Sequence, residues 1–157
     1  IELLLVLAII GIISAIAIPA LLSQRARARD KSATSNAVSK VADLVGQWDK
    51  AREAGTSAGT IITTNLTDYL KTTTANEKNP WAGTTGAPAA PFNTTIAAVA
   101  GTTASAFETA LQAKCTNTTL GQVQFGYQLP TATGTLGFIG AAVLTQGGVK
   151  SKVSSLE

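Results

Sequence analysis

Few residues in this chain are of types that do chemistry. It has nine acidic and twelve basic residues, no histidine, no methionine and one cysteine, Cys115, among 157 residues. This inventory excludes a histidine relay, histidine-ligated haem and an internal disulfide. Between Thr116 and Val149 no residue is charged, and nowhere does the spacing suggest a carboxylate pair, a nucleophile with its base, or a metal-ligand cluster. The sequence therefore predicts no enzyme, no cofactor and no metal site, and we interpret Cys115 as a small buried hydrophobe.

One carboxylate stands in an unusual place. Glu2 lies at the start of an almost wholly apolar run that spans residues 1–22, IELLLVLAIIGIISAIAIPALL, and contains one glycine, Gly11, and one proline, Pro19. As a helix this run would be about 33 Å long, enough to cross the hydrocarbon core of a bilayer. An unpaired carboxylate in such an environment costs several kcal/mol, so Glu2 is expected to have a partner.

The order of these residues resembles the N-terminal segment of type IV pilins and pseudopilins. The resemblance is carried by the Ile1-Glu2 pair, by AIIGI at residues 8–12 and by AIAIP at residues 15–19. A signal peptide would begin with basic residues and have a shorter apolar core, and a generic membrane anchor would not explain Glu2. The resemblance covers residues 1–22 and, more loosely, the helix beyond them.

The resemblance implies that Glu2, Gly11 and Pro19 act in assembly. In the family, the glutamate lies in an apolar filament core near the amine of its own or a neighbouring subunit, and the backbone between the glycine and the proline unwinds on packing. The family's mature chain starts a few residues earlier with an N-methylated residue, after cleavage by prepilin peptidase. In the family, the subunit is held in the inner membrane until the pilus assembly machinery adds it to a cell-surface filament.

The long helix that would position these residues is expected to run from Ile1 to Ala54 and to end at Gly55. Residues 1–22 form its apolar transmembrane or filament-core part, and residues 23–54 form an amphipathic continuation. In the continuation, Val38, Val41, Val45 and Trp48 recur at helical spacing, with Ala37, Leu44 and Ala51 beside them, and predict the stripe that contacts the head.

Residues 55–157 are expected to form a globular head, which makes the fold α+β, with the long helix packed on a small antiparallel sheet. Residues 55–92 read as a long connection with one helical turn at 66–70, and Trp81 as an anchor that holds this connection on the sheet. Strands are predicted at residues 94–99, 122–129, 135–145 and 148–154, a helix at 104–114, and a hairpin turn at Pro130 and Gly134. Without a disulfide, aromatic side chains would have to pack against the helix stripe, namely Phe107, Phe125, Tyr127 and Phe138.

Several surface features allow more than one interpretation. Arg25, Arg27 and Arg29 either form a solvated basic turn or reach lipid head groups before assembly and Asp30, Asp43 or Asp49 of neighbouring subunits after it. Three sequons are candidate glycosylation sites, or chance matches in a threonine-rich chain: Asn65, Asn93 and Asn117. The net charge of +3 leaves nucleic acid open as a partner.

The sequence thus predicts a structural subunit of a type IV pilus, a homo-oligomer in a helical filament. A pseudopilin of a type II secretion system is the first alternative, and a membrane-anchored binding domain is the second. Major pseudopilins typically bind calcium through carboxylates in C-terminal loops, whereas this C-terminal third is charge-free over residues 116–149. Whether the filament would serve motility, adhesion or uptake stays open.

Overall fold

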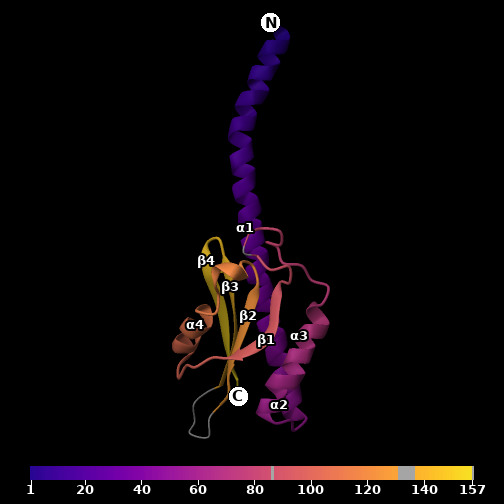
Figure 1. Ribbon diagram of the computed structural model, residues 1–157, viewed down its shortest axis with the longest axis vertical. Helices are drawn as coiled ribbons and strands as arrows, with labels where there is room; N and C mark the ends of the chain where they lie inside the picture. The colour runs from indigo at the N-terminus through magenta and orange to yellow at the C-terminus, as the bar shows by residue number, and fades with distance from the viewer. Residues whose placement is uncertain (86, 131–136, 157) are drawn as a thin grey trace.

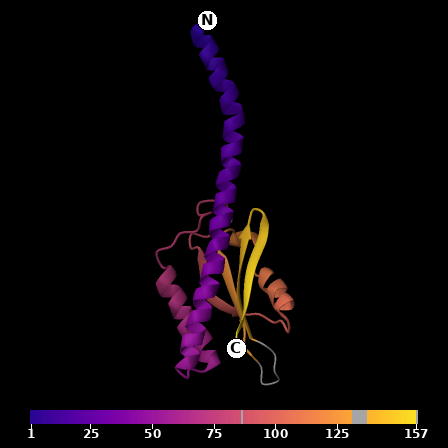
Figure 2. The same cartoon turned by 180° about the vertical axis from the view of Figure 1, so that it is seen from behind.

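The computed structural model describes residues 1–85, 87–130 and 137–156, which form a long projecting helix and a compact head (Figure 1). Helix α1 spans Glu2–Glu53, and a four-stranded sheet packs on its second half. This arrangement confirms the predicted α+β fold. The first half of α1 stands clear of the head in both views (Figure 1 and Figure 2).

The second half of α1 supplies one face of the core. Its buried residues are mainly small or aliphatic and recur every three or four positions: Ala33, Ala37, Val41, Leu44, Trp48 and Ala51. The predicted stripe is therefore wrong at Val38, which is 45% exposed, and Val45 is only half-buried. Alanines take these core positions because they let the sheet approach the helix closely, so burial here follows helical position rather than side-chain size.

The connection after α1 is more helical than predicted. Three consecutive segments, α2 (Ala58–Thr60), the π-helical η1 (Ile61–Leu66) and α3 (Thr67–Thr74), include the single turn expected at 66–70. They bury four aliphatic side chains in the same core as α1: Ile61, Ile62, Leu66 and Leu70. Burial of these side chains explains why this threonine-rich stretch is helical, because tertiary packing overrides its low helix propensity.

The sheet contains β1 (Phe92–Ala98), β2 (Val123–Gln128), β3 (Gly137–Thr145) and β4 (Gly148–Leu156), in that spatial order. Strands β2, β3 and β4 are antiparallel as expected, whereas β1 is parallel to β2. The parallel pairing arises because a crossover separates these two strands and contains α4 (Ala104–Gln112) and the 3₁₀ turn η2 (Asn117–Thr119). The hairpin turn predicted at Pro130 and Gly134 falls mainly outside the described residues.

Helices α1 and α4 cover opposite faces of the sheet. Alternate residues of β3 point to the two sides: Ile139, Ala141 and Val143 join the core under α1, while Phe138 and Ala142 join Phe107 and Leu111 of α4. Phe107 and Phe138 therefore do not pack against the α1 stripe, as the sequence had suggested, although Phe125 and Tyr127 do. Helix α4 packs closely on the sheet because two sheet residues are glycines. A Cβ atom at Gly126 or Gly140 would come within 3.0 Å of the Leu111 side chain.

Candidate assembly surface and its support

The first half of α1 is the largest exposed apolar surface of the described chain. Residues 3–7 are five consecutive Leu or Val residues, each more than half exposed, so the apolar surface surrounds the helix instead of forming a stripe. This part of α1 has no buried residue, and it is long and apolar enough to cross a membrane. Because every side of this helix is apolar, one partner helix would leave part of it in contact with water.

The three predicted assembly residues all lie on this surface. Glu2 occupies the exposed first turn of α1, where the positive end of the helix dipole favours a carboxylate. A Cβ atom added to Gly11 would meet nothing within 4 Å. Pro19 lies inside the helix without interrupting it, although proline has no N–H to donate to the carbonyl one turn earlier. The single subunit is thus helical from Gly11 to Pro19, and unwinding of this segment in a filament stays a prediction.

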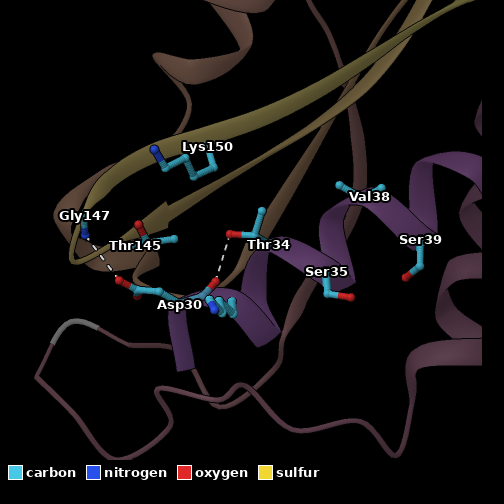
Figure 3. A pocket seen from close by; sticks show the side chains of 9 residues that line it. Asp30, Thr34, Ser35, Val38, Ser39, Thr145, Gly147 and Lys150 are labelled. Carbon is cyan, nitrogen blue, oxygen red and sulfur yellow. Dashed lines mark hydrogen bonds between the residues drawn. The ribbon is translucent and has the colours of Figure 1, made fainter. Parts of the chain in front are cut away.

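The apolar half meets the head at a polar junction centred on Asp30. One carboxylate oxygen of Asp30 accepts hydrogen bonds from Trp81 Nε1 and from the backbone N–H of Gln146, both at 3.1 Å. The other oxygen accepts from the N–H of Gly147 at 3.3 Å (Figure 3). Arg29 lies over the Trp81 ring, with Cζ 5.2 Å from its centroid. The Asp30 carboxylate therefore ties three distant chain segments together.

Trp81 is the anchor that the sequence predicted, but its hydrogen bond runs to α1 instead of the sheet. Its side chain is 3% exposed and bonds Asp30. Asp30 therefore has partners in its own subunit, and its contact with an arginine of a neighbouring subunit stays a prediction. Asp43 likewise lies 3.8 Å from Lys40 of its own subunit. Asp49 is exposed and forms no ion pair among the described residues.

A second set of contacts, made by Asn79, fastens the loop after α3 to the rest of the head. The amide of Asn79 is 3% exposed; it donates to the carbonyls of Pro88 and Leu120 and accepts from the N–H of Trp81, all within 2.9 Å. Gly121 has a φ of +72°, and a Cβ atom there would lie 2.3 Å from Asn79 Oδ1. The loop and the start of β2 can meet only because position 121 carries no side chain.

Lys40 contacts both ends of the same loop, at Glu77 shortly after α3 and at Phe92 where β1 begins. Its ammonium lies 3.4 Å from Glu77 and 5.6 Å from the centre of the Phe92 ring, and its side chain is 13% exposed. An ammonium that is largely removed from water gains from both a carboxylate and an aromatic face. Lys40, Asn79 and Asp30 are therefore structural residues of the head, and sequence reasoning had assigned none of them this role.

The three sequons differ in accessibility. Asn65 is exposed on η1, whereas the Asn93 amide donates to Gln124 Oε1 at 2.8 Å from within β1. Asn117 opens η2, and its side chain lies outside the described part of the chain. Of the two that can be judged, Asn65 is the one whose amide nitrogen is free of a hydrogen bond within the described residues.

Cys115 is half-buried, against the core under α4. Burial raises the pKa of its thiol to about 11, so at neutral pH it is a thiol and not a reactive thiolate. This environment agrees with the interpretation of Cys115 as a packing residue. Within residues 1–85, 87–130 and 137–156, no group of three or more acidic, histidine or cysteine side chains lies close enough to hold a metal ion.

No family model, curated protein sequence or solved structure matches this chain. The structure by itself shows a long apolar N-terminal helix whose second half packs on a small, mostly antiparallel sheet. This architecture is pilin-like, with a compact head and an exposed apolar helix that projects from it.

Proposed function

We propose that this protein is a type IV pilin, a structural subunit that polymerises through the apolar half of α1 into a helical cell-surface filament. The observation that carries the proposal is the exposed apolar surface on all sides of residues 1–22, continuous with a helix built rigidly into the head. Lipid would cover this surface in the inner membrane before assembly, and other copies of the chain would cover it afterwards.

Energetics support an assembly role over a soluble one. Residues 1–22 expose fourteen large apolar side chains. Covering each one stabilises the assembled state by about 1.5–3 kcal/mol, so the total is on the order of tens of kcal/mol, before the entropy of assembly is subtracted. Because the head buries its own core while this much apolar helix stays exposed, we infer that the helix contacts lipid or other subunits.

Two alternative functions fit the observations less well than the pilin proposal. A pseudopilin of type II secretion would use the same helix, but the strands β2 and β3 and the turn between β3 and β4 come from the charge-free span 116–149, which offers no carboxylate for calcium. A membrane-anchored binding domain would need only an apolar anchor, and it would give Glu2 no role. Neither alternative predicts long surface filaments.

The test is substitution of Glu2 in cells that make the protein. We expect Glu2→Gln to abolish filaments while the subunit still accumulates in the inner membrane, because an uncharged side chain cannot form the ion pair expected in the apolar core. Electron microscopy counts filaments, and immunoblots of membrane fractions measure the subunit. Asp68→Asn is the control, since Asp68 is an exposed surface residue paired with Lys71, and this variant should form filaments normally.

Two results would contradict the proposal. Normal filaments in the Glu2→Gln strain would show that the carboxylate plays no part in assembly. Absence of this subunit from surface filaments of the unsubstituted strain, as judged by peptide mapping, would favour the membrane-anchored domain.

A further inference from the structure

A groove of about 570 Å³ lies between α1 and the turn that joins β3 to β4 (Figure 3). This turn is at the end of the head from which the exposed half of α1 projects, as both views show (Figure 1 and Figure 2). Lys31, Thr34 and Ser35 line the groove from the helix, and Thr145 and Lys150 line it from the two strands. The groove is therefore close to the place where the apolar half of α1 would leave a membrane.

The groove offers two cations to a ligand. Lys31 and Lys150 are exposed, and neither forms an ion pair within the described part of the chain. Asp30 also lines the groove, but its two carboxylate oxygens already accept hydrogen bonds from Trp81 and from the backbone of the turn. These three charged side chains of the groove sum to +1, and the exposed Arg27, one helical turn before Lys31, adds a further positive charge. The groove therefore favours an anion.

The distance of the groove from the apolar segment indicates which anion it would meet. If residues 1–22 cross the hydrocarbon core, the helical rise places Arg27 about 8 Å and Lys31 about 14 Å beyond Leu22. The headgroup layer of a bilayer is about 5–8 Å thick on each side. Because helical side chains slant towards the N-terminus, long cationic side chains at these positions extend back into that layer. The phosphate of a lipid is the anion that is concentrated there.

We propose that the groove binds the headgroup of an anionic phospholipid, with the phosphate between Lys31 and Lys150. The hydroxyls of Thr34 and Ser35 line the groove further from the membrane, where they can bond the glycerol hydroxyls of a headgroup such as that of phosphatidylglycerol. The inference rests on the proposed function only in that residues 1–22 span the membrane before assembly. It adds a lipid that contacts both α1 and β4 and so holds the head in a fixed orientation on the membrane.

Native mass spectrometry of the full chain in detergent measures the affinity for lipid. The chain would be titrated with phosphatidylglycerol and with phosphatidylcholine of the same acyl chains, and we expect phosphatidylglycerol to bind more tightly. Lys31→Gln and Lys150→Gln should each weaken the binding of phosphatidylglycerol about fivefold, and the double variant about 25-fold, because each lysine near an anionic lipid contributes about that factor. The binding of phosphatidylcholine should stay unchanged in all three variants.

Two controls show whether the groove itself is responsible. The variant Lys50→Gln/Arg52→Gln removes the same amount of charge from the last turn of α1, about 30 Å from Lys31 along the helix, and should bind phosphatidylglycerol normally. Lys150 lies on β4, so normal binding by Lys150→Gln would mean that the basic residues of α1 alone attract the lipid, and this result would overturn the groove. Displacement of phosphatidylglycerol by an equal concentration of inorganic phosphate would reveal a site for free phosphate and would overturn the lipid assignment.

The outcomes separate this site from the proposed function. Equal affinity for the two lipids, in a chain that still inserts into vesicles, would overturn the lipid site and leave the pilin proposal standing. Selective binding of phosphatidylglycerol by a chain that is absent from surface filaments would support the site and contradict the pilin proposal. A chain that inserts into vesicles of neither lipid would overturn both.

Discussion

Removal of the Asp30 carboxylate gives the sharpest test of how the head is held together. Asp30→Ala would remove the acceptor of three hydrogen bonds, from Trp81 Nε1, Gln146 N and Gly147 N, at 3.1–3.3 Å. These bonds join α1 to Trp81, which is 51 positions further along the chain, and to Gln146 and Gly147, which are more than 110 positions further along. No local structure can therefore replace them.

The expected cost follows from the number and kind of these bonds. A hydrogen bond to a charged group contributes about 1.5–3 kcal/mol when it is well shielded, and less when water competes for it. Asp30 is half-buried, and its bonds are of moderate length. We therefore take about 1 kcal/mol for each and expect Asp30→Ala to lower the free energy of unfolding by about 3 kcal/mol. This is a large part of the roughly 5–15 kcal/mol that stabilises a typical domain.

Urea unfolding of the full chain in detergent micelles, followed by tryptophan fluorescence, measures this free energy. Trp81→Phe should cost about 1 kcal/mol or slightly more, and the double variant Asp30→Ala/Trp81→Phe should cost less than the sum, because the two residues share one bond. Asp49→Ala is the control, since Asp49 is exposed and forms no ion pair in the described chain, and it should change the free energy of unfolding by under about 0.5 kcal/mol. A loss below about 0.5 kcal/mol for Asp30→Ala, or strictly additive costs in the double variant, would refute the assignment of Asp30 as the junction.

Three further predictions concern the head. Gly121→Ala should destabilise the protein by about 2 kcal/mol or more in the same unfolding assay, because residue 121 has a φ of +72° and its added Cβ atom would collide with Asn79. Gly46→Ala is the control: position 46 lies on an open helix face, so this change should stabilise the protein by up to about 1 kcal/mol. Asn79→Ala should cost about 2 kcal/mol, since it leaves the carbonyls of the half-buried residues Pro88 and Leu120 without this donor. An unchanged urea midpoint would contradict this expectation. Alkylation of Cys115 by iodoacetamide should be slow at pH 8 and should accelerate about tenfold per pH unit towards the pKa of about 11, because only the thiolate reacts; a rate that levels off near pH 9 would contradict the burial-raised pKa.

Local pattern was enough to predict most elements of this chain. The apolar run, the helical spacing after it and Gly55 predicted α1 to within a residue at each end, since a helix depends on neighbours three and four positions away. Alternation predicted β2 to within one residue at each end, and β4 was predicted with its correct first residue and an end two residues short. The assembly role of Glu2, Gly11 and Pro19 was predicted from their order within one helix, and it stays a prediction.

Tertiary structure alone decided which contacts hold the head. The orientation of β1 depends on where a crossover returns, and the exposure of Val38 depends on which side of α1 the sheet approaches. Asp30 and Asn79 look like ordinary polar residues in the sequence, and apart from the Trp81 N–H that donates to Asn79, the partners of their side chains lie 9 to 117 positions away. Such contacts are set by the packing of whole elements, because a hydrogen bond between distant segments forms only after the core has brought them together. The sequence by itself determined a rod with an exposed apolar end, and the packing of the sheet against that rod decided which polar residues join the two.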